Sequence, residues 1–127
     1  MFPSVNTTNT NSWENLLGNY EKKKNITIKE LFENDGERFQ KYAIQSADIL
    51  FDFSKNNIDE ETLSLLLGLA DDCKLKEAID AMFSAEKINK TEDRAVLHTA
   101  LRNFSGKPVV LDGKDIMPDV NGVLAQM

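Results

Sequence analysis

The chain has 127 residues, of which 21 are acidic and 15 basic, so its formal net charge is -6 at pH 7. This acidic balance argues against a general affinity for nucleic acid or anionic membranes, because both require a basic surface. The longest apolar run, at 65–70, is much shorter than the ~20 residues of a membrane-spanning helix. We therefore expect neither nucleic acid nor a membrane among the partners.

Two residue types that often carry chemistry occur once each, as Cys73 and His98. A single cysteine cannot form an intrachain disulfide, which suits the reducing cytosol. One cysteine and one histidine also cannot supply the usual zinc ligand sets. The segment 1–11 is rich in Asn and Thr and lacks the basic start and apolar stretch of a secretory signal. These features predict a cytoplasmic protein that begins with a flexible tail at 1–11.

Helical periodicity dominates the first half of the chain. Apolar residues recur at helical spacing after Asn11, and Thr27 with Glu30 has the spacing of a capping box, so two helix starts are predicted. Helical turns are expected up to Ala43. Alternating apolar residues at 49–53 then predict a short strand.

The strongest helical pattern follows Asp59, a residue suited to an N-cap. Its predicted apolar face consists of Leu63, Leu66, Leu67 and Ala70. The next helix has Leu75, Ala78, Ile79, Met82 and Phe83 on its predicted inner side. Both patterns are typical of amphipathic helices that bury one face.

Capping-box spacing recurs at Asn89 and Glu92 and predicts a helix that ends near Arg102, with Leu97 in the core. A brief strand is predicted at 109–111.

The pair Asp112-Gly113 is a turn signal, and Pro118 fits the first turn of a last helix. The apolar period of that helix is still running at Met127. The sequence thus predicts a mostly α-helical segment with two short strands, in which 12–127 form an incomplete domain behind the tail.

Candidate catalytic groups are scarce. Adjacent carboxylates such as Glu60 and Glu61 point apart on a helix, so they do not form an acid–base pair. The glycines are scattered, and no phosphate loop or nucleophile motif occurs. His98 has Arg94 and Arg102 one turn away and no acidic partner at that spacing to orient its ring. The residues alone therefore predict no catalytic, substrate-binding or metal-binding side chain.

The segment Ile88–Arg102 reads Ile-Asn-Lys-Thr-Glu-Asp-Arg-Ala-Val-Leu-His-Thr-Ala-Leu-Arg and closely resembles glucose-6-phosphate isomerases. The stretches Phe51–Asn56 and Met82–Asn89 resemble the same family in the same order. Val110–Pro118 is similar to the animal-type version of the enzyme. One departure is Ala85, which stands where the family usually has glycine.

The resemblance implies an α/β fold of layered, sugar-isomerase type, whose N-terminal segment is mostly helical and wraps the rest. It implies an aldose–ketose isomerase of glycolysis and gluconeogenesis that interconverts glucose 6-phosphate and fructose 6-phosphate as a cytosolic homodimer. Proton transfer runs through an enediol, without metal or organic cofactor. A glutamate base, a histidine and an arginine act in the family, and Ser/Thr-rich loops hold the phosphate.

In the family, all of these groups come from later parts of the chain. The resemblance therefore gives Glu92, Arg94 and His98 no catalytic role and places them in the scaffold. It favours an N-terminal part of the isomerase that is inactive alone. The alternative is a short isoform without catalysis that binds partners, and some animal members also act outside cells as cytokine-like factors.

Overall fold

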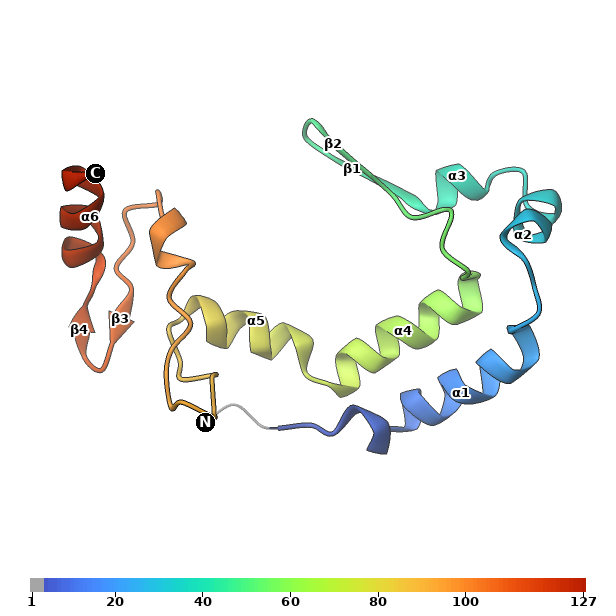
Figure 1. Cartoon of the computed structure of the whole chain (residues 1–127), viewed down its shortest axis with the longest axis horizontal. Helices are drawn as coiled ribbons and strands as arrows, with labels where there is room; N and C mark the ends of the chain where they lie inside the picture. Colours follow the sequence, from blue (N-terminus) through green and yellow to red (C-terminus); the bar gives the residue numbers. More distant parts are fainter. Residues whose placement is uncertain (1–3) are drawn as a thin grey trace. The chain divides into compact units, whose positions relative to one another are not determined.

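The computed structural model describes residues 4–127 and divides them into two compact units. One unit is Asn6–Asp72, and the other combines Cys73–Met127 with the N-terminal residues up to Val5. Helices and short antiparallel strand pairs make up both units (Figure 1). The prediction of a mostly helical α/β segment with short strands is confirmed.

The first unit contains, in chain order, η1 (Thr7–Asn9), α1 (Asn11–Lys23), α2 (Ile28–Asn34), α3 (Arg38–Lys41), β1 (Ala43–Ser46), β2 (Ile49–Asp52) and α4 (Glu60–Asp72). The predicted helix starts are confirmed. Thr27 and Glu30 form a complete capping box at α2, and Asp59 Oδ1 accepts the Thr62 amide hydrogen at 2.9 Å before α4. These caps satisfy amide donors that the first helical turn leaves unpaired.

The predicted tail at 1–11 includes residues 1–3, which lie outside the described residues. In the rest of this segment, Asn6 caps η1 by accepting the Thr8 amide hydrogen at 3.1 Å. Thr10 caps α1 by accepting the Trp13 amide hydrogen at 3.2 Å. Short polar side chains therefore organise the entry into α1.

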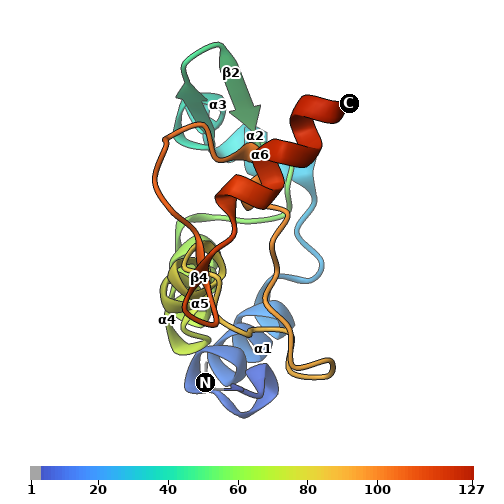
Figure 2. The same cartoon turned by 90° about the vertical axis from the view of Figure 1, so that its left-hand side faces the viewer.

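Helices α1 and α4 lie side by side in both views (Figures 1 and 2). At one end, Thr62 Oγ1 lies 2.9 Å from Asn19 Oδ1. At the other end, the Ser12 amide donates to Asp72 at 3.2 Å. Gly68 lies between these contacts, where an added Cβ would meet Ser12 Oγ at 3.2 Å. The small residue thus permits the close approach of the two helices.

The predicted apolar face of α4 is only partly right. Leu63 and Ala70 are half-buried, but Leu66 is 41% exposed and Leu67 is 59% exposed. Apolar residues occur on most sides of α4, so periodicity could not decide which leucines meet α1. The core position predicted for Leu66 is therefore wrong within this chain.

Strands β1 and β2 form an antiparallel hairpin that extends from α3 (Figure 1). The strand predicted at 49–53 is confirmed as β2, but its partner was missed, because Ala43 was expected to continue the helical turns. An isolated strand leaves its backbone donors and acceptors unpaired, so β2 requires a neighbour. The preceding segment, Ala43–Ser46, is that neighbour.

One face of this hairpin is apolar. Ile44 is paired with Phe51, and Ile49 and Phe53 share their face at a spacing of two residues. The exposed fractions are 57% for Ile44, 72% for Ile49 and 62% for Phe51. Phe51 and Phe53 stack with ring centroids 5.3 Å apart. Within the described chain, this apolar face is thus largely open to solvent.

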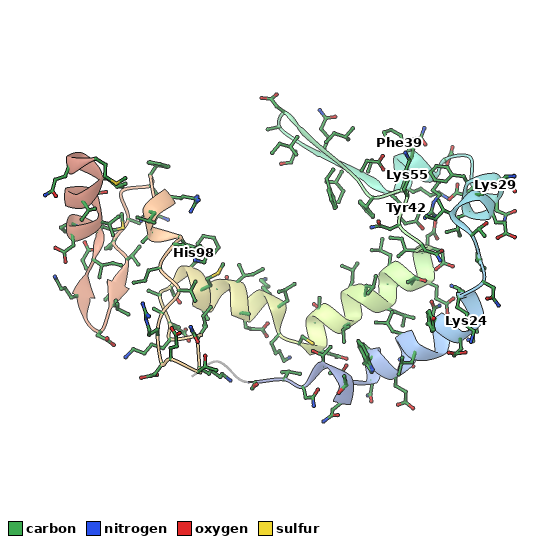
Figure 3. All side chains as sticks on the ribbon, in the orientation of Figure 1. Lys24, Lys29, Phe39, Tyr42, Lys55 and His98 are labelled. Carbon is green, nitrogen blue, oxygen red and sulfur yellow. The ribbon has the colours of Figure 1, made fainter. Side chains whose placement is uncertain are left out.

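Arg38 is the most deeply buried cation of the first unit, with 2% of its surface exposed. Its guanidinium lies 4.5 Å from the ring centre of Tyr42, at the end of α3 (Figure 3). It donates to three backbone carbonyls, those of Ser54 (2.8 Å), Asn56 (2.8 Å) and Ile58 (2.7 Å). Arg38 therefore organises the turn that leads from β2 into α4.

The second unit contains α5 (Leu75–Phe83), η2 (Ala100–Arg102), β3 (Val110–Leu111), β4 (Lys114–Asp115) and α6 (Met117–Gln126). The turn predicted at Asp112-Gly113 joins β3 to β4, and both residues have positive φ, 49° and 82°. Aspartate and glycine tolerate this conformation better than other residues. Pro118 lies in the first turn of α6 as predicted.

The end of α5 has the geometry of a Schellman motif. The Glu86 amide donates to the Ala81 carbonyl at 3.0 Å, and the Ala85 amide donates to the Met82 carbonyl at 3.4 Å. This arrangement requires a left-handed residue after the cap, a position at which glycine is favoured. Here the residue is Ala85, which is buried and has a φ of 61°. The glycine that the family resemblance implies at this position would adopt this conformation without strain.

We expect Ala85→Gly to raise the free energy of unfolding by about 0.5–1 kcal/mol, because a left-handed alanine is strained and glycine is not. Urea unfolding followed by far-UV circular dichroism measures the change. Ala78→Gly is the matched control, since Ala78 lies inside α5. There the same substitution should lower stability by a similar amount. A destabilised Ala85→Gly variant would contradict the strain argument.

Candidate functional site

The family-like segment at 88–102 is not the helix that the sequence predicts. The amide and carbonyl groups of Asn89 and Arg94 exchange two hydrogen bonds of 3.1 Å. They close a tight turn in which Asp93 has a φ of 48°. Only Ala100–Arg102 are helical, as the 3-10 helix η2. The helix predicted from Asn89 to Arg102 is therefore wrong.

The Asn89 side chain explains part of this outcome. Its Oδ1 accepts from the Thr91 hydroxyl at 2.8 Å, and its Nδ2 donates to Glu92 Oε2 at 3.3 Å. Such local bonds offer the backbone an alternative to a helix. The capping-box spacing of Asn89 and Glu92 therefore occurs here in a turn and does not mark the start of a helix. Leu97, expected on a buried helical face, is half-buried outside any helix.

The structure does not assemble an acid–base set from Glu92, Arg94 and His98. Glu92 Oε2 lies 3.3 Å from Arg94 Nη1, and both side chains are well exposed. His98 lies between α5 and η2 and is exposed (Figure 3). Its carbonyl accepts a long 3.4 Å hydrogen bond from Arg102. The geometry supports a turn-forming ion pair for Glu92 and Arg94, and the scaffold role of His98 stays a prediction.

A metal site is not apparent in the part of the chain that the structure describes: residues 4–127 contain no cluster of three His, Cys, Asp or Glu side chains. None of the described helices is both long and apolar enough to cross a bilayer.

A cavity of about 310 Å³ lies beside α1 in the first unit. Its wall includes Trp13, Leu16, Leu17 and Tyr20 from α1, with Lys23 and Lys24 near the end of the helix. Both lysines are already engaged: Lys23 pairs with Asp59 and Glu61, and Lys24 pairs with Glu21. The cavity therefore offers an apolar surface but little uncommitted charge.

Asn19 is the buried polar residue in this wall, and its Nδ2 has no hydrogen-bond partner when Oδ1 faces Thr62. The Thr62 hydroxyl carries one proton, yet it lies 2.9 Å from Asn19 Oδ1 and 2.7 Å from Asp59 Oδ1. With the amide turned, Nδ2 donates to Thr62 and the hydroxyl donates to Asp59. This orientation gives Nδ2 a partner without a ligand.

Asp59 is the electrostatic centre of the contact between α1 and α4. Partial burial by itself raises its pKa, but hydrogen bonds from Lys23 and from the Thr62 amide and hydroxyl outweigh it, so the pKa falls to about 2. The pKa of Glu61 is also lowered, mainly by its hydrogen bond from Lys23. Both carboxylates therefore stabilise the contact in their charged form.

A second cavity, of about 540 Å³, lies in the second unit beside the loop that follows η2. Its wall consists of Phe83, Thr99, Arg102, Asn103, Phe104, Ser105, Lys107, Pro108 and Val109. The sequence patterns predicted no site among these residues, because most of them lie in the loop after η2, where no periodic pattern predicts which way a side chain points.

Residues 52–127 match the phosphoglucose isomerase family, which is the glucose-6-phosphate isomerase family under another name. The match covers more than half of the chain and runs from the end of β2 through α6. The chain belongs to the phosphoglucose isomerase family. The resemblance seen in the 88–102 segment is thereby confirmed, while the animal-type likeness stays a prediction. Membership relates the chain to isomerases of glucose 6-phosphate, which are enzymes of glycolysis.

Proposed function

We propose that the chain is a scaffold portion of a glucose-6-phosphate isomerase and does not itself transfer the proton. The observation that carries this proposal is the family match over 52–127. Within the described residues, Glu92, Arg94 and His98 are not arranged as catalytic partners. The reacting groups, the phosphate loops and the partner subunit of a cytosolic homodimer would then come from protein outside this chain.

Exposed apolar side chains support this assignment. In the first unit, Ile44, Ile49 and Phe51 leave one face of the β1–β2 hairpin open. In the second unit, Val123 is 59% exposed and Leu124 is 43% exposed on α6. Faces of this kind gain free energy when further protein covers them. They are expected of a segment that packs against the body of an enzyme.

The proposal is tested by a coupled isomerase assay on the chain, purified from a host that lacks its own isomerase. We expect no turnover above background, because Glu92, Arg94 and His98 are not arranged as catalytic partners. Co-expression with the remainder of a family isomerase, deleted for the equivalent of 1–127, should restore activity, with the remainder alone as control. Turnover by the chain near the ~10 per second of an ordinary enzyme would overturn the proposal. Failure of the combined pieces to regain activity would count against the scaffold role.

A further inference from the structure

The second unit has a cavity with positive charge and no negative charge on its wall. Arg102 and Lys107 face it from η2 and from the following loop, whereas no Asp or Glu lines it. Among residues 4–127, no ion pair involves either cation. Lys87 and Lys114 of the same unit pair with aspartates, whereas Arg102 and Lys107, in the described part of the chain, keep their charge unpaired beside the cavity. The wall is therefore locally cationic in an acidic chain.

The loop that presents these cations is held by its own hydrogen bonds. Asn103 Oδ1 accepts from the Ser105 hydroxyl at 2.6 Å and from the Ser105 amide at 3.2 Å. Asn103 Nδ2 donates to the Lys107 carbonyl at 2.8 Å. Gly106 takes a φ of 71°, which closes the turn. A loop fixed in this way loses little conformational freedom when it binds a ligand.

Two aromatic rings stand on the same wall. Phe104 is 90% exposed and Phe83 is 63% exposed. Phe104 belongs to this loop, and its ring is open to solvent. A ring-bearing ligand would cover that apolar surface while the cations hold its charge, a combination that gives both affinity and orientation.

From these features we propose that the 102–109 loop and Phe83 form a binding site for a phosphate monoester that carries an aromatic ring. Arg102 and Lys107 hold the dianion through charge-assisted hydrogen bonds, with the Thr99 hydroxyl as a further donor on the wall. The ring lies against Phe104. Arg102 is suited to this task because its guanidinium donates one long hydrogen bond, of 3.4 Å, to the His98 carbonyl, which leaves its other N–H donors available.

Ligand-observed NMR on the full chain at constant salt tests the site, with phenyl phosphate, inorganic phosphate and phenol as probes. We expect phenyl phosphate to bind more tightly than either other probe. Arg102→Gln and Lys107→Gln should each weaken its binding about three- to tenfold, since each removes a charge-assisted contact. Phe104→Ala should weaken phenyl phosphate but leave inorganic phosphate unchanged.

Lys55→Gln is the matched control, because Lys55 is an exposed lysine of the other unit. It should leave binding unchanged. The proposal is overturned if the Arg102→Gln/Lys107→Gln double variant binds phenyl phosphate as the parent chain does. An equal loss of phenyl phosphate binding in Lys55→Gln would show that the attraction is non-specific and would also overturn the proposal. The same holds if phenol binds as tightly as phenyl phosphate, because the wall would then act only as an apolar surface. All of these substitutions are at exposed positions, so folding should be preserved.

Discussion

Replacing Arg38 by methionine should lower the free energy of unfolding of the Asn6–Asp72 unit by about 3 kcal/mol. Methionine keeps much of the apolar stem but removes the Arg38 donors to the carbonyls of Ser54, Asn56 and Ile58. The Asn56 carbonyl keeps a 2.9 Å hydrogen bond from the Ile58 amide, so the cost falls mainly on the other two carbonyls. An unsatisfied buried acceptor costs about 1–3 kcal/mol, and part of this cost is offset because the cation no longer has to be buried. Urea unfolding followed by fluorescence of Trp13, the only tryptophan, reports on this unit.

Two further variants sharpen this test. Arg38→Lys keeps the charge but not the planar fork, so it should fall between the parent chain and Arg38→Met. Lys29→Met is the matched control, because the Lys29 side chain is 84% exposed and lies in the same unit as Trp13. It should change stability by less than about 0.5 kcal/mol. If Arg38→Met were as mild as Lys29→Met, the carbonyl contacts of Arg38 would not organise the turn before α4.

Acid should weaken the contact between α1 and α4. Because the pKa of Asp59 is lowered to about 2 in the folded chain, its charged form stabilises folding above the ordinary aspartate pKa of about 4. That stabilisation should be lost as the pH falls from about 4 to about 2. Since Asp59 and Lys23 are both partly exposed, solvent screening reduces the effect, and we expect about 1–2 kcal/mol.

Asp59→Asn provides the measurement. The variant should be less stable than the parent chain by about 1–2 kcal/mol at pH 7 and nearly as stable at about pH 2, where roughly half of the parent carboxyl is protonated in the folded chain. Trp13 fluorescence in urea again gives the free energy. Asp48→Asn, at the exposed hairpin turn away from the contact between α1 and α4, is the control and should change stability at pH 7 by less than about 0.5 kcal/mol. A stability difference that persists at pH 2 would mean that shape and not charge makes Asp59 important.

Contacts between elements, both local and distant, decided several features that sequence patterns could not predict. β1 and β4 are short and weakly patterned, and they form because β2 and β3 need a partner for their backbone groups. Leu66 faces solvent because α1 selected another side of α4. Arg38 reads as an ordinary surface charge in the sequence, yet three carbonyls from 54–58 make its burial possible.

The candidate anion site belongs to the same class of feature. Arg102, Lys107 and Phe104 have no telling spacing, and they share a wall only because Asn103 and Gly106 turn the loop on itself. A helix over 89–102, as the sequence predicts, would have placed Arg102 differently relative to the loop that follows it. A capping-box pattern describes local hydrogen bonds, and in this segment the same residues satisfy those bonds in a turn.

Local sequence patterns were enough to predict the helix starts at α1, α2 and α4, the Asp-Gly turn and the mostly helical character, and the matching stretches were enough to predict the family. Those features depend on hydrogen bonds within a few residues or on a long run of matching residues. The buried face of α4 and the burial of Arg38 were set by contacts between segments far apart in the chain, about which a short pattern carries no information. The strand partners and the turn at 88–102 are local, but more than one local hydrogen-bond arrangement suits these residues, and the patterns did not decide between them.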